Sequence, residues 1–371
     1  MSQAEKTVKG LLAKADVIVG GSRPWDIQVH NDAWYERILS NGSLALGESY
    51  MDGWWDSPAL DQFFFKVFAA KLESSIGYDW RFILQVIRAR LLNTQKFGLA
   101  AKNARRHYDI GNDLYSVMLD KRLVYTCGYW KDSDTLDAAQ EAKLDLVCRK
   151  IGLKAGQRVL DIGCGWGSWA KFAGEKYGAH VVGVTVSPEQ VELGKKLCAG
   201  LPVEIQLLDY RKITGTYDHI ISLGMFEHVG YKNYRTYMQV AREHLADDGL
   251  FLLHTIGGNK SATTTDPWID RYVFPGGVLP SAKQITTAVE RLFIIEDWHN
   301  FGPDYDRTLM AWWHNFDQHW PELKQKYGDR FYRQWKYYLL SCAGSFRVRN
   351  NNLWQIVLSK NGRVGGYTSV R

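Results

Sequence analysis

Apolar and polar positions along the chain follow two different patterns, which change near residue 105. Residues 1 to about 92 have a helical pattern, with short polar interruptions at 41–43 and around Ser57-Pro58. The later residues alternate short apolar, β-rich runs with helix-like stretches such as 169–176 and 188–198. The first pattern predicts a small helical domain, and the second predicts a sheet whose strands are joined by helices.

Seven runs in the later part have the length and composition of β-strands. They span residues 157–162, 180–185, 203–208, 219–223, 250–255, 293–297 and 353–359. The first five are separated by helix-like stretches, a pattern typical of a parallel, doubly wound α/β sheet. The last run follows a helix-like insertion, about 303–352, that is rich in Trp and Tyr. This insertion is either a lid over a ligand or an added pair of core helices.

A basic segment lies between the two patterns. Residues 93–105 are predicted to link a helical N-terminal domain, 1–92, to a second domain, 106–371. Between Arg81 and Tyr108 the chain has seven Lys and Arg residues and no Asp or Glu, and apolar residues recur at helical spacing in the first half. Such a segment is either a surface that binds membrane or nucleic acid, or a solvated helix followed by a basic linker.

Composition narrows the class of protein. The 15 Trp, 20 Tyr and 15 Phe residues exceed what a core usually requires, so they predict either a Trp-rich core or a wall for a long apolar or cationic ligand. The five cysteines are scattered without metal-ligand spacing, which argues against disulfides and a metal site and suits a reducing cytosol. The N-terminal residues do not form a secretory signal. No apolar run approaches the roughly 20 residues of a spanning helix, so any membrane contact is expected to be peripheral.

The strongest local motif is residues 159–167. A predicted strand ends in Asp161 and continues directly into three glycines at alternate positions, Gly163, Gly165 and Gly167. Glycine allows the backbone to turn tightly and to approach a ligand without a Cβ in the way. The preceding strand and the following helix give this motif the context of a nucleotide-type cofactor loop.

The next two strand ends distinguish between cofactors. A dehydrogenase would have an acidic residue after the second strand to bind the ribose hydroxyls, whereas this chain has Thr185 and Gln190 there. The third strand ends in Asp209 and Tyr210, where a carboxylate suits an adenine amine. These residues favour S-adenosylmethionine over a dinucleotide. The predicted fold is therefore the α/β, doubly wound, seven-stranded methyltransferase (Rossmann-like) sheet, with a small helical N-terminal domain.

Five further blocks carry a more specific resemblance. They are residues 47–55, 107–113, 125–130, 224–230 and 254–257. Because all five occur in one order, the chain closely resembles the bacterial cyclopropane-fatty-acyl-phospholipid synthases from about residue 20 to about residue 360. Block 47–55 resembles an N-terminal domain that the shorter mycolic-acid cyclopropane synthases lack, and in the family this domain helps to bind lipid and to form a dimer.

The resemblance implies an activity and a location. The family transfers a methylene group from S-adenosylmethionine to the cis double bond of unsaturated phospholipid acyl chains, which forms a cyclopropane. A bound bicarbonate ion is thought to be the general base. The implied partners are membrane phospholipid, the membrane surface and a second copy of the chain. The implied location is cytoplasmic, peripherally associated with the inner face of the membrane.

The resemblance also implies the site residues. The bicarbonate site corresponds to Cys127, Glu227, His254, Ile256 and Tyr305, with Cys127 and Ile256 contributing backbone groups. Contacts to the cofactor carry over to Tyr125, Thr126, Asp161, Gly163, Gly165, Gly167, Thr185, Gln190, Asp209 and Tyr210. Cys342 matches a cysteine once considered for covalent catalysis, but no step of this chemistry requires a sulfur nucleophile, so a packing or binding role is favoured.

Three other interpretations fit part of the sequence. An enzyme of the same fold that methylates an acyl chain or a small amine without closing a ring would share the cofactor site, but the bicarbonate-site residues favour the synthase. A nucleic-acid methyltransferase would need a broad basic surface, and usually an Asn/Asp-Pro-Pro-aromatic motif where this chain has residues 225–230, so no nucleic-acid partner is expected. A non-catalytic lipid-binding relative should lack Glu227, His254 or the glycine loop, and all three are present.

Overall fold

The computed structural model describes residues 1–72 and 110–371. The predicted basic segment, the linker 93–105, the domain boundary at residue 92 and the first three residues of block 107–113 all lie outside these residues.

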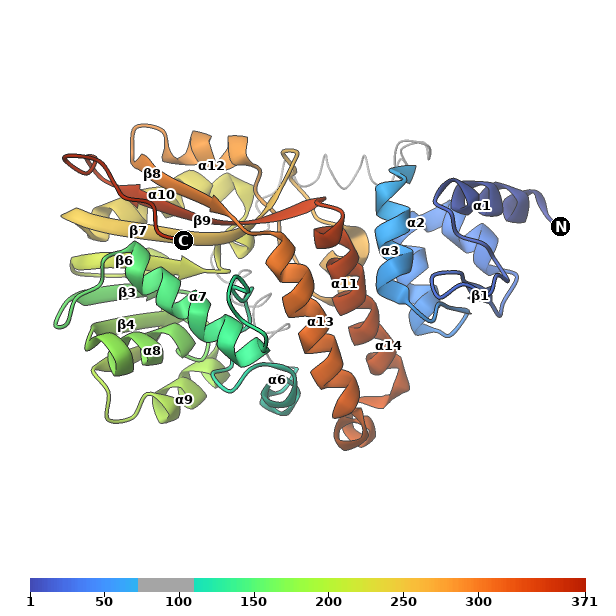
Figure 1. Cartoon of the computed structure of the whole chain (residues 1–371), viewed down its shortest axis with the longest axis horizontal. Helices are drawn as coiled ribbons and strands as arrows, with labels where there is room; N and C mark the ends of the chain where they lie inside the picture. Colours follow the sequence, from blue (N-terminus) through green and yellow to red (C-terminus); the bar gives the residue numbers. More distant parts are fainter. Residues whose placement is uncertain (73–109) are drawn as a thin grey trace.

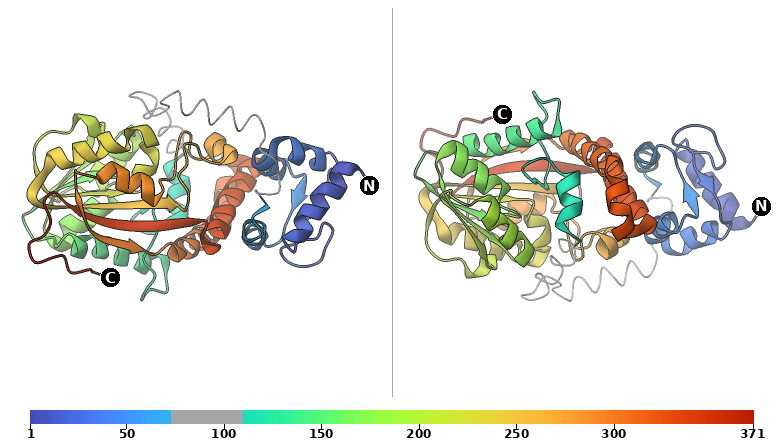
Figure 2. Two further views of the ribbon diagram at one scale, coloured as in Figure 1. Left: turned by 90° about the horizontal axis from the view of Figure 1, so that it is seen from above. Right: turned by 90° about the horizontal axis from the view of Figure 1, so that it is seen from below.

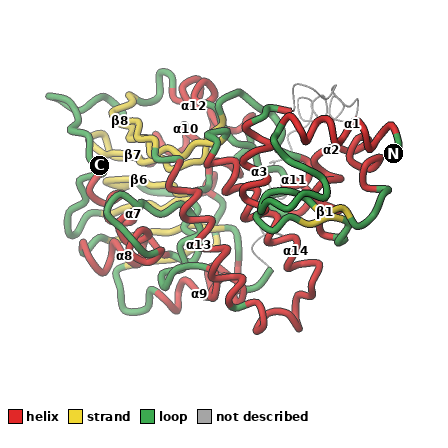
Figure 3. Tube along the Cα trace, turned by 45° about the vertical axis from the view of Figure 1, so that its right-hand side comes forward, coloured by secondary structure: helices red, strands yellow, loops and turns green. Residues whose placement is uncertain are grey.

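Residues 1–72 are mainly helical (Figure 3). They form α1 (Gln3–Lys14), β1 (Gln28–Val29), α2 (Trp34–Met51), β2 (Trp55–Asp56) and α3 (Leu60–Ala69). The polar interruption at 41–43 is a kink inside α2, where Gly42 has a φ of 52°. The predicted helical character is thus confirmed here. The small antiparallel sheet of β1 and β2 was not predicted, because strands of two residues leave no alternating pattern.

The second part contains a seven-stranded sheet in the order β5–β4–β3–β6–β7–β9–β8 (Figure 1). Its strands are β3 (Arg158–Ile162), β4 (His180–Thr185), β5 (Val203–Leu207), β6 (Tyr217–Leu223), β7 (Leu245–Gly258), β8 (Ile294–Asn300) and β9 (Asn351–Ser359). Each overlaps one predicted run, and β9 is antiparallel to both of its neighbours. The predicted methyltransferase-type sheet is confirmed. The strand order reverses between β3 and β6, which is where such sheets bind ligands.

Helices cover both faces of this sheet (Figure 2). The helices that the structure describes after residue 109 are α6 (Asn112–Met118), α7 (Leu136–Lys150), α8 (Ser168–Tyr177), α9 (Pro188–Leu197), α10 (Tyr234–His244), α11 (Pro267–Tyr272), α12 (Ala282–Val289), α13 (Pro303–Gln318) and α14 (Trp320–Arg347). Of these, α7, α8 and α9 share a core with one face of the sheet, and α10 and α12 share a core with the other. Successive residues of β3 point to opposite faces, so Val159 packs with α7 and α8 while Leu160 packs with α10 and α12. Burial on both faces explains why the central strands are continuous apolar runs.

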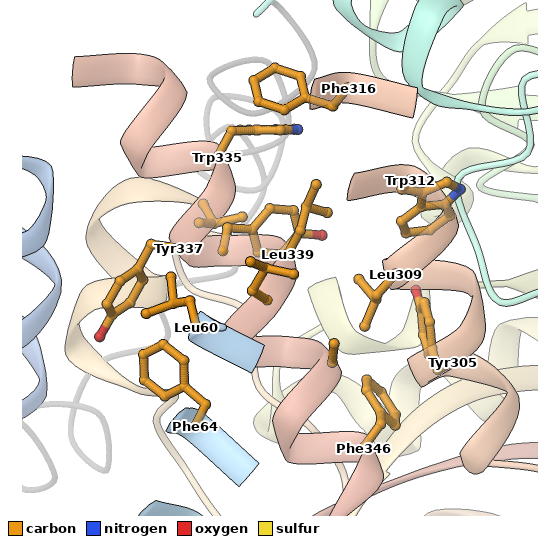
Figure 4. Close-up of a cluster of buried hydrophobic side chains, with 14 of the residues drawn as sticks. Leu60, Phe64, Tyr305, Leu309, Trp312, Phe316, Trp335, Tyr337, Leu339 and Phe346 are labelled. Carbon is orange, nitrogen blue, oxygen red and sulfur yellow. The ribbon is translucent and has the colours of Figure 1, made fainter. Parts of the chain in front are cut away.

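The aromatic insertion forms α13 and α14, which lie between the sheet and the N-terminal helices (Figure 1). Trp312, Phe316 and Trp335 have no exposed surface and belong to one core cluster. Figure 4 shows Phe64 of α3 facing Tyr337 of α14, and their ring centroids are 5.0 Å apart. This packing supports the interpretation of the insertion as added core helices. Among the described helices, none is both long and apolar enough to cross a membrane.

Block 47–55 joins the N-terminal helices to the second part of the chain. A Cβ added to Gly47 of α2 would lie 2.3 Å from Cδ1 of Trp268 on α11, and the Trp268 indole donates to Sδ of Met51 at 3.4 Å. Arg333 of α14 donates to the Trp55 carbonyl at 2.8 Å. Gly47 is therefore required because two helices meet with no room for a side chain.

Gly47→Ala should lower the free energy of unfolding by about 1–3 kcal/mol, the usual cost of overpacking a tight contact. Chemical denaturation measures the change. Gly10→Ala in α1 is the matched control, because a Cβ there meets nothing within 4 Å. It should leave stability unchanged or raise it by about 0.5–1 kcal/mol. Equal stability of the two variants would show that α2 and α11 are not packed this closely.

Candidate active site

A pocket opens at the carboxyl ends of β3, β4, β5 and β6. Nine of the ten predicted cofactor residues line it: Tyr125, Thr126, Asp161, Gly163, Gly165, Thr185, Gln190, Asp209 and Tyr210. Gly167 lies outside the lining, at the first turn of α8. A Cβ on Gly167 would lie 3.1 Å from both Sγ of Cys198 and Cδ1 of Ile205. Its role in this structure is therefore close packing behind the loop.

The other two glycines of the loop face different surroundings. Gly163 has a φ of 81°, and an added Cβ would lie 2.7 Å from Cβ of Met225. Gly165 has a φ of 56°, and an added Cβ would meet nothing within 4 Å. Because Gly165 is part of the pocket wall, its bare backbone faces the space that a ligand would fill.

The carboxyl groups of Asp161 and Asp209 differ in their pKa and in their hydrogen-bond partners. Asp161 is 2% exposed, burial raises its pKa to about 7, and its Oδ1 has no hydrogen-bond partner among the described residues. Thus Asp161 has an unused acceptor. Burial also disfavours the charge on Asp209, but hydrogen bonds from Arg211 outweigh it and hold the pKa of Asp209 below its usual value. Both Asp209 oxygens already accept from that guanidinium, at 2.8 and 2.6 Å.

Glu227 lies beside this pocket, in a 3₁₀ turn (Phe226–His228) that follows β6. Its Oε1 accepts from the backbone N–H of Ile256 at 2.7 Å, while its buried Oε2 has no partner among the described residues. Burial raises the pKa of Glu227 to about 7. One carboxylate oxygen is therefore fixed and the other is available to a ligand.

His254 lies on β7, opposite Leu223 at the end of β6. Gln355, directly across on β9, places its Nε2 3.3 Å from Nδ1 of His254. Burial lowers the pKa of His254 well below its usual value, and the charges of Lys143 and Lys150 act in the same direction. The ring is thus neutral, and because the Gln355 amide donates to Nδ1, its proton is on Nε2. This Nε2 is buried and has no partner in the described part of the chain.

Tyr305 lies in the first turn of α13 and is 8% exposed. Its ring packs against Phe346, with centroids 4.6 Å apart, and edge-on against Trp312 at 6.0 Å (Figure 4). Burial raises the pKa of Tyr305, and its electrostatic interactions with Cys127 and Glu227 act in the same direction. These electrostatic interactions place Tyr305 in the neighbourhood of both residues, as a neutral phenol.

Cys127 has no exposed surface, and its thiol donates to the Gly128 carbonyl at 3.2 Å. Burial raises the pKa of this thiol well above its usual value, so it remains protonated. The hydroxyl of Thr308 accepts from the Gly128 N–H at 3.1 Å and from the Trp130 indole at 2.8 Å. α13 therefore holds the loop segment that contains Cys127.

The predicted base-site residues are thus brought together. His254 and Ile256 are two apart on β7 and share a face of the strand, Ile256 bonds to Glu227, and Tyr305 interacts with Glu227 and Cys127. No group of three or more His, Cys, Asp or Glu side chains in residues 1–72 and 110–371 is arranged to hold a metal ion.

Cys342 does not have the surroundings of a nucleophile. Burial raises its pKa to about 12. Arg347, the nearest cation in sequence, pairs instead with Asp61 at 2.7 Å and Asp306 at 2.8 Å. A reactive cysteine needs a stabilised thiolate, so these contacts support a packing role for Cys342.

Sequence reasoning missed three polar side chains around the site: Lys143, Thr308 and Gln355. Lys143 had a usable signal, because it lies on the apolar stripe of α7 between Ala139 and Val147. Thr308 and Gln355 had none. Their partners, Gly128 and His254, are 180 and 101 positions away in the sequence.

Comparison with known proteins identifies the family. Residues 95–356 match the family described as mycolic acid cyclopropane synthetase. The cyclopropane-fatty-acyl-phospholipid synthase of Escherichia coli strain K12 is 51% identical over 350 residues, which cover 94% of this chain and 92% of the relative.

Two solved structures agree with this match. The cyclopropane synthase MmaA2 of Mycobacterium tuberculosis has a TM-score of 0.66 and 30% identity, covering 70% of this chain and 98% of that one. The mycolic acid cyclopropane synthase CmaA1, complexed with SAH and CTAB, has a TM-score of 0.66 and 31% identity over the same shares. The predicted resemblance and enzyme class are confirmed, and the chain belongs to the cyclopropane synthase family of S-adenosylmethionine-dependent methyltransferases.

Proposed function

We propose that the enzyme transfers a methylene group from S-adenosylmethionine to the cis double bond of an unsaturated phospholipid acyl chain, which forms a cyclopropane ring. The observation that carries this proposal is a pair of buried polar atoms beside the pocket, Oε2 of Glu227 and Nε2 of His254, which have no hydrogen-bond partner among the described residues. Ring closure requires a base for a proton of the new methyl group, and these two atoms offer a place to hold one.

The residues around this pair suit a small anion with proton-accepting oxygens, such as bicarbonate. Neutral His254 offers an N–H, Tyr305 offers a phenol, and Glu227, with a pKa of about 7, offers either a carboxylate or an O–H donor. We propose that these three side chains hold bicarbonate, with the backbone of Cys127 and Ile256 nearby. When bound, the ion supplies a base for the methyl proton.

The chain's own residues would orient the methyl donor, exclude water and stabilise the positive charge. The pocket residues orient S-adenosylmethionine, which supplies an electrophilic methyl group. Attack by the double bond on this methyl group would break its bond to sulfur, release S-adenosylhomocysteine and leave a positive charge on the acyl chain. Ring closure would then require loss of a proton from the new methyl group. Buried aromatic rings near the site, such as Tyr305 and Tyr338, exclude water and present π-faces that stabilise a cation. Glu227 and His254 would hold the base close to this proton.

The product tests the proposal. The protein is incubated with vesicles of an unsaturated phospholipid and labelled S-adenosylmethionine, and the lipid product is identified by proton NMR. Ring protons are expected. A methylidene or a methylated alkene has the same added mass, so mass alone is insufficient. A methyl-branched product without a ring would contradict the proposal and favour the simple methyltransferase.

We further propose that the enzyme binds membranes peripherally through residues 81–106 and forms a homodimer through its N-terminal domain, 1–92. The basic composition of that segment supports the first proposal. The family resemblance of block 47–55 and the exposed side chains Ile18 and Leu39 support the second. Light scattering on the full chain should give twice the 42.5 kDa mass of one copy.

Reversing Arg88, Lys102 and Arg106 to Glu should sharply weaken binding to anionic vesicles, because each basic residue near such a surface contributes about 1 kcal/mol. High salt should have the same effect on the unaltered protein. Cosedimentation with vesicles measures binding. The control reverses three exposed lysines elsewhere, Lys154, Lys176 and Lys195. If the first variant binds as well as the control, the segment is only a solvated helix and linker.

A further inference from the structure

The wall of the cofactor pocket contains a buried lysine. Lys143 of α7 has no exposed surface, yet it lines the same pocket as Thr126 and Asp161. Its Nζ donates to the Thr126 hydroxyl at 2.7 Å. An ammonium has three N–H donors, and no other hydrogen bond and no ion pair within 4.0 Å is present for Lys143 in the described part of the chain.

The nearest carboxylates do not neutralise this ammonium by direct contact. Asp120 is buried, and its two oxygens accept from the backbone N–H groups of Val124 at 2.8 Å and Arg122 at 3.0 Å. Oδ1 of Asp161 has no hydrogen-bond partner within residues 1–72 and 110–371, and Asp161 lies beyond ion-pair distance of Lys143. Burial lowers the pKa of Lys143 to about 8, and the negative charges of Asp120 and Asp161 oppose this shift. The lysine is therefore still mainly protonated near neutral pH.

A second buried lysine on the same helix shows what an ordinary arrangement looks like. The Lys150 side chain also has no exposed surface, but its Nζ lies 3.6 Å from Asp297 and 3.1 Å from His299. Lys150 is absent from the pocket lining. Buried charges in proteins are normally paired because an isolated one is costly. Lys143 thus differs from Lys150 in two ways. It has no anion within 4.0 Å among the described residues, and it lies at the wall of a ligand pocket.

The pocket wall therefore presents two separated groups, an ammonium and an unpartnered carboxylate oxygen. A ligand with one carboxylate and one ammonium would satisfy both, and the amino-acid end of S-adenosylmethionine has this pair. We propose that Lys143 binds the carboxylate of the cofactor's methionyl group. Asp161 accepts from its ammonium. The proposal rests on the assignment of this pocket to S-adenosylmethionine.

Two ligands that differ only at the amino-acid end provide the test. S-Adenosylhomocysteine has the carboxylate and the ammonium, whereas 5′-methylthioadenosine keeps the adenosine and the thioether and lacks both. By calorimetry, Lys143→Met should weaken the binding of S-adenosylhomocysteine about tenfold or more, the usual effect of losing a hydrogen bond to a charged group. Its affinity for methylthioadenosine should stay within about twofold of the unaltered protein. Lys150→Met is the matched control and should bind both ligands normally.

Other outcomes would overturn the proposal. Equal weakening for both ligands would mean that Lys143 only supports the loop through Thr126, and no weakening for either would mean that it has no role in binding. Should Lys143→Met fail to fold, Lys143→Gln keeps a donor for Thr126 without the charge. The unaltered protein gives an independent measurement, because decarboxylated S-adenosylhomocysteine should bind about tenfold more weakly than the parent ligand. Equal binding of these two would also overturn the proposal.

The cofactor assignment is checked separately. If the unaltered protein binds neither S-adenosylhomocysteine nor methylthioadenosine, the pocket itself has been wrongly assigned. If it binds S-adenosylhomocysteine tightly and Gly165→Val abolishes this binding, the pocket assignment stands. The Lys143 result then decides the role of the lysine alone.

Discussion

Glu227→Gln should lower turnover about 100-fold or more, the usual contribution of a positioned general base, while the affinity for S-adenosylhomocysteine changes little. The amide oxygen can still accept from the Ile256 N–H, so the link between the 3₁₀ turn Phe226–His228 and β7 is retained. What is lost is the ionisable oxygen, the buried Oε2 that has no partner among the described residues. The substitution therefore separates catalysis from cofactor binding and from folding.

The dependence of activity on bicarbonate tests the same role of Glu227 in a second way. Activity of the unaltered enzyme should fall when bicarbonate is removed from the buffer and return when it is restored, whereas Glu227→Gln should respond weakly. A carbocation that waits for its base can lose a different proton, so the variant should also release small amounts of unsaturated, methyl-branched lipid. Glu243→Gln, an exposed change on α10, serves as the control and should be fully active. If Glu227→Gln is fully active and the enzyme is indifferent to bicarbonate, another group is the base, with Tyr305 or His254 next to be tested.

Gly165→Val should abolish measurable binding of S-adenosylhomocysteine, and with it turnover. The new side chain would extend from the pocket wall into space that is now open, so it would occupy the position of the ligand. The φ of 56° at this residue also disfavours a β-branched side chain, and the variant should therefore lose some stability.

The strain and the blocked pocket can be distinguished with a second glycine. Gly156 has a φ of 80° and equally open surroundings, but it precedes β3 at the opposite end of the strand and is not part of the pocket. Gly156→Val should lose similar stability and still bind the ligand. Calorimetry and thermal unfolding on both variants measure the two effects. Normal binding by Gly165→Val would remove this loop from the cofactor site.

The succession of strands and helices along the chain could be predicted from the sequence because each element depends mainly on residues that are adjacent in the sequence. The period of apolar residues indicates a strand or a helix within a few positions, and all seven strands of the sheet overlapped predicted runs. The residues after each strand could also be assigned to one edge, since parallel strands end together. Asp161 lies near the end of β3, and Asp209 and Glu227 follow β5 and β6. Asp161 and Asp209 line the pocket at that edge, and Glu227 lies beside it.

Only the tertiary structure determined which contacts those side chains make and which of their polar atoms have no partner among the described residues. The engagement of Asp209 by Arg211, the register that places Gln355 opposite His254, and the fit of Gly47 against Trp268 depend on exact distances. The same is true of Lys143, whose place on an apolar stripe indicated burial but not that its ammonium would have no anionic partner within 4.0 Å among the described residues. Hydrogen bonds and desolvation act over a few ångströms, between residues that can be more than a hundred positions apart. A sequence pattern records which side chains are buried, and only the folded chain determines which of them remain available to a ligand.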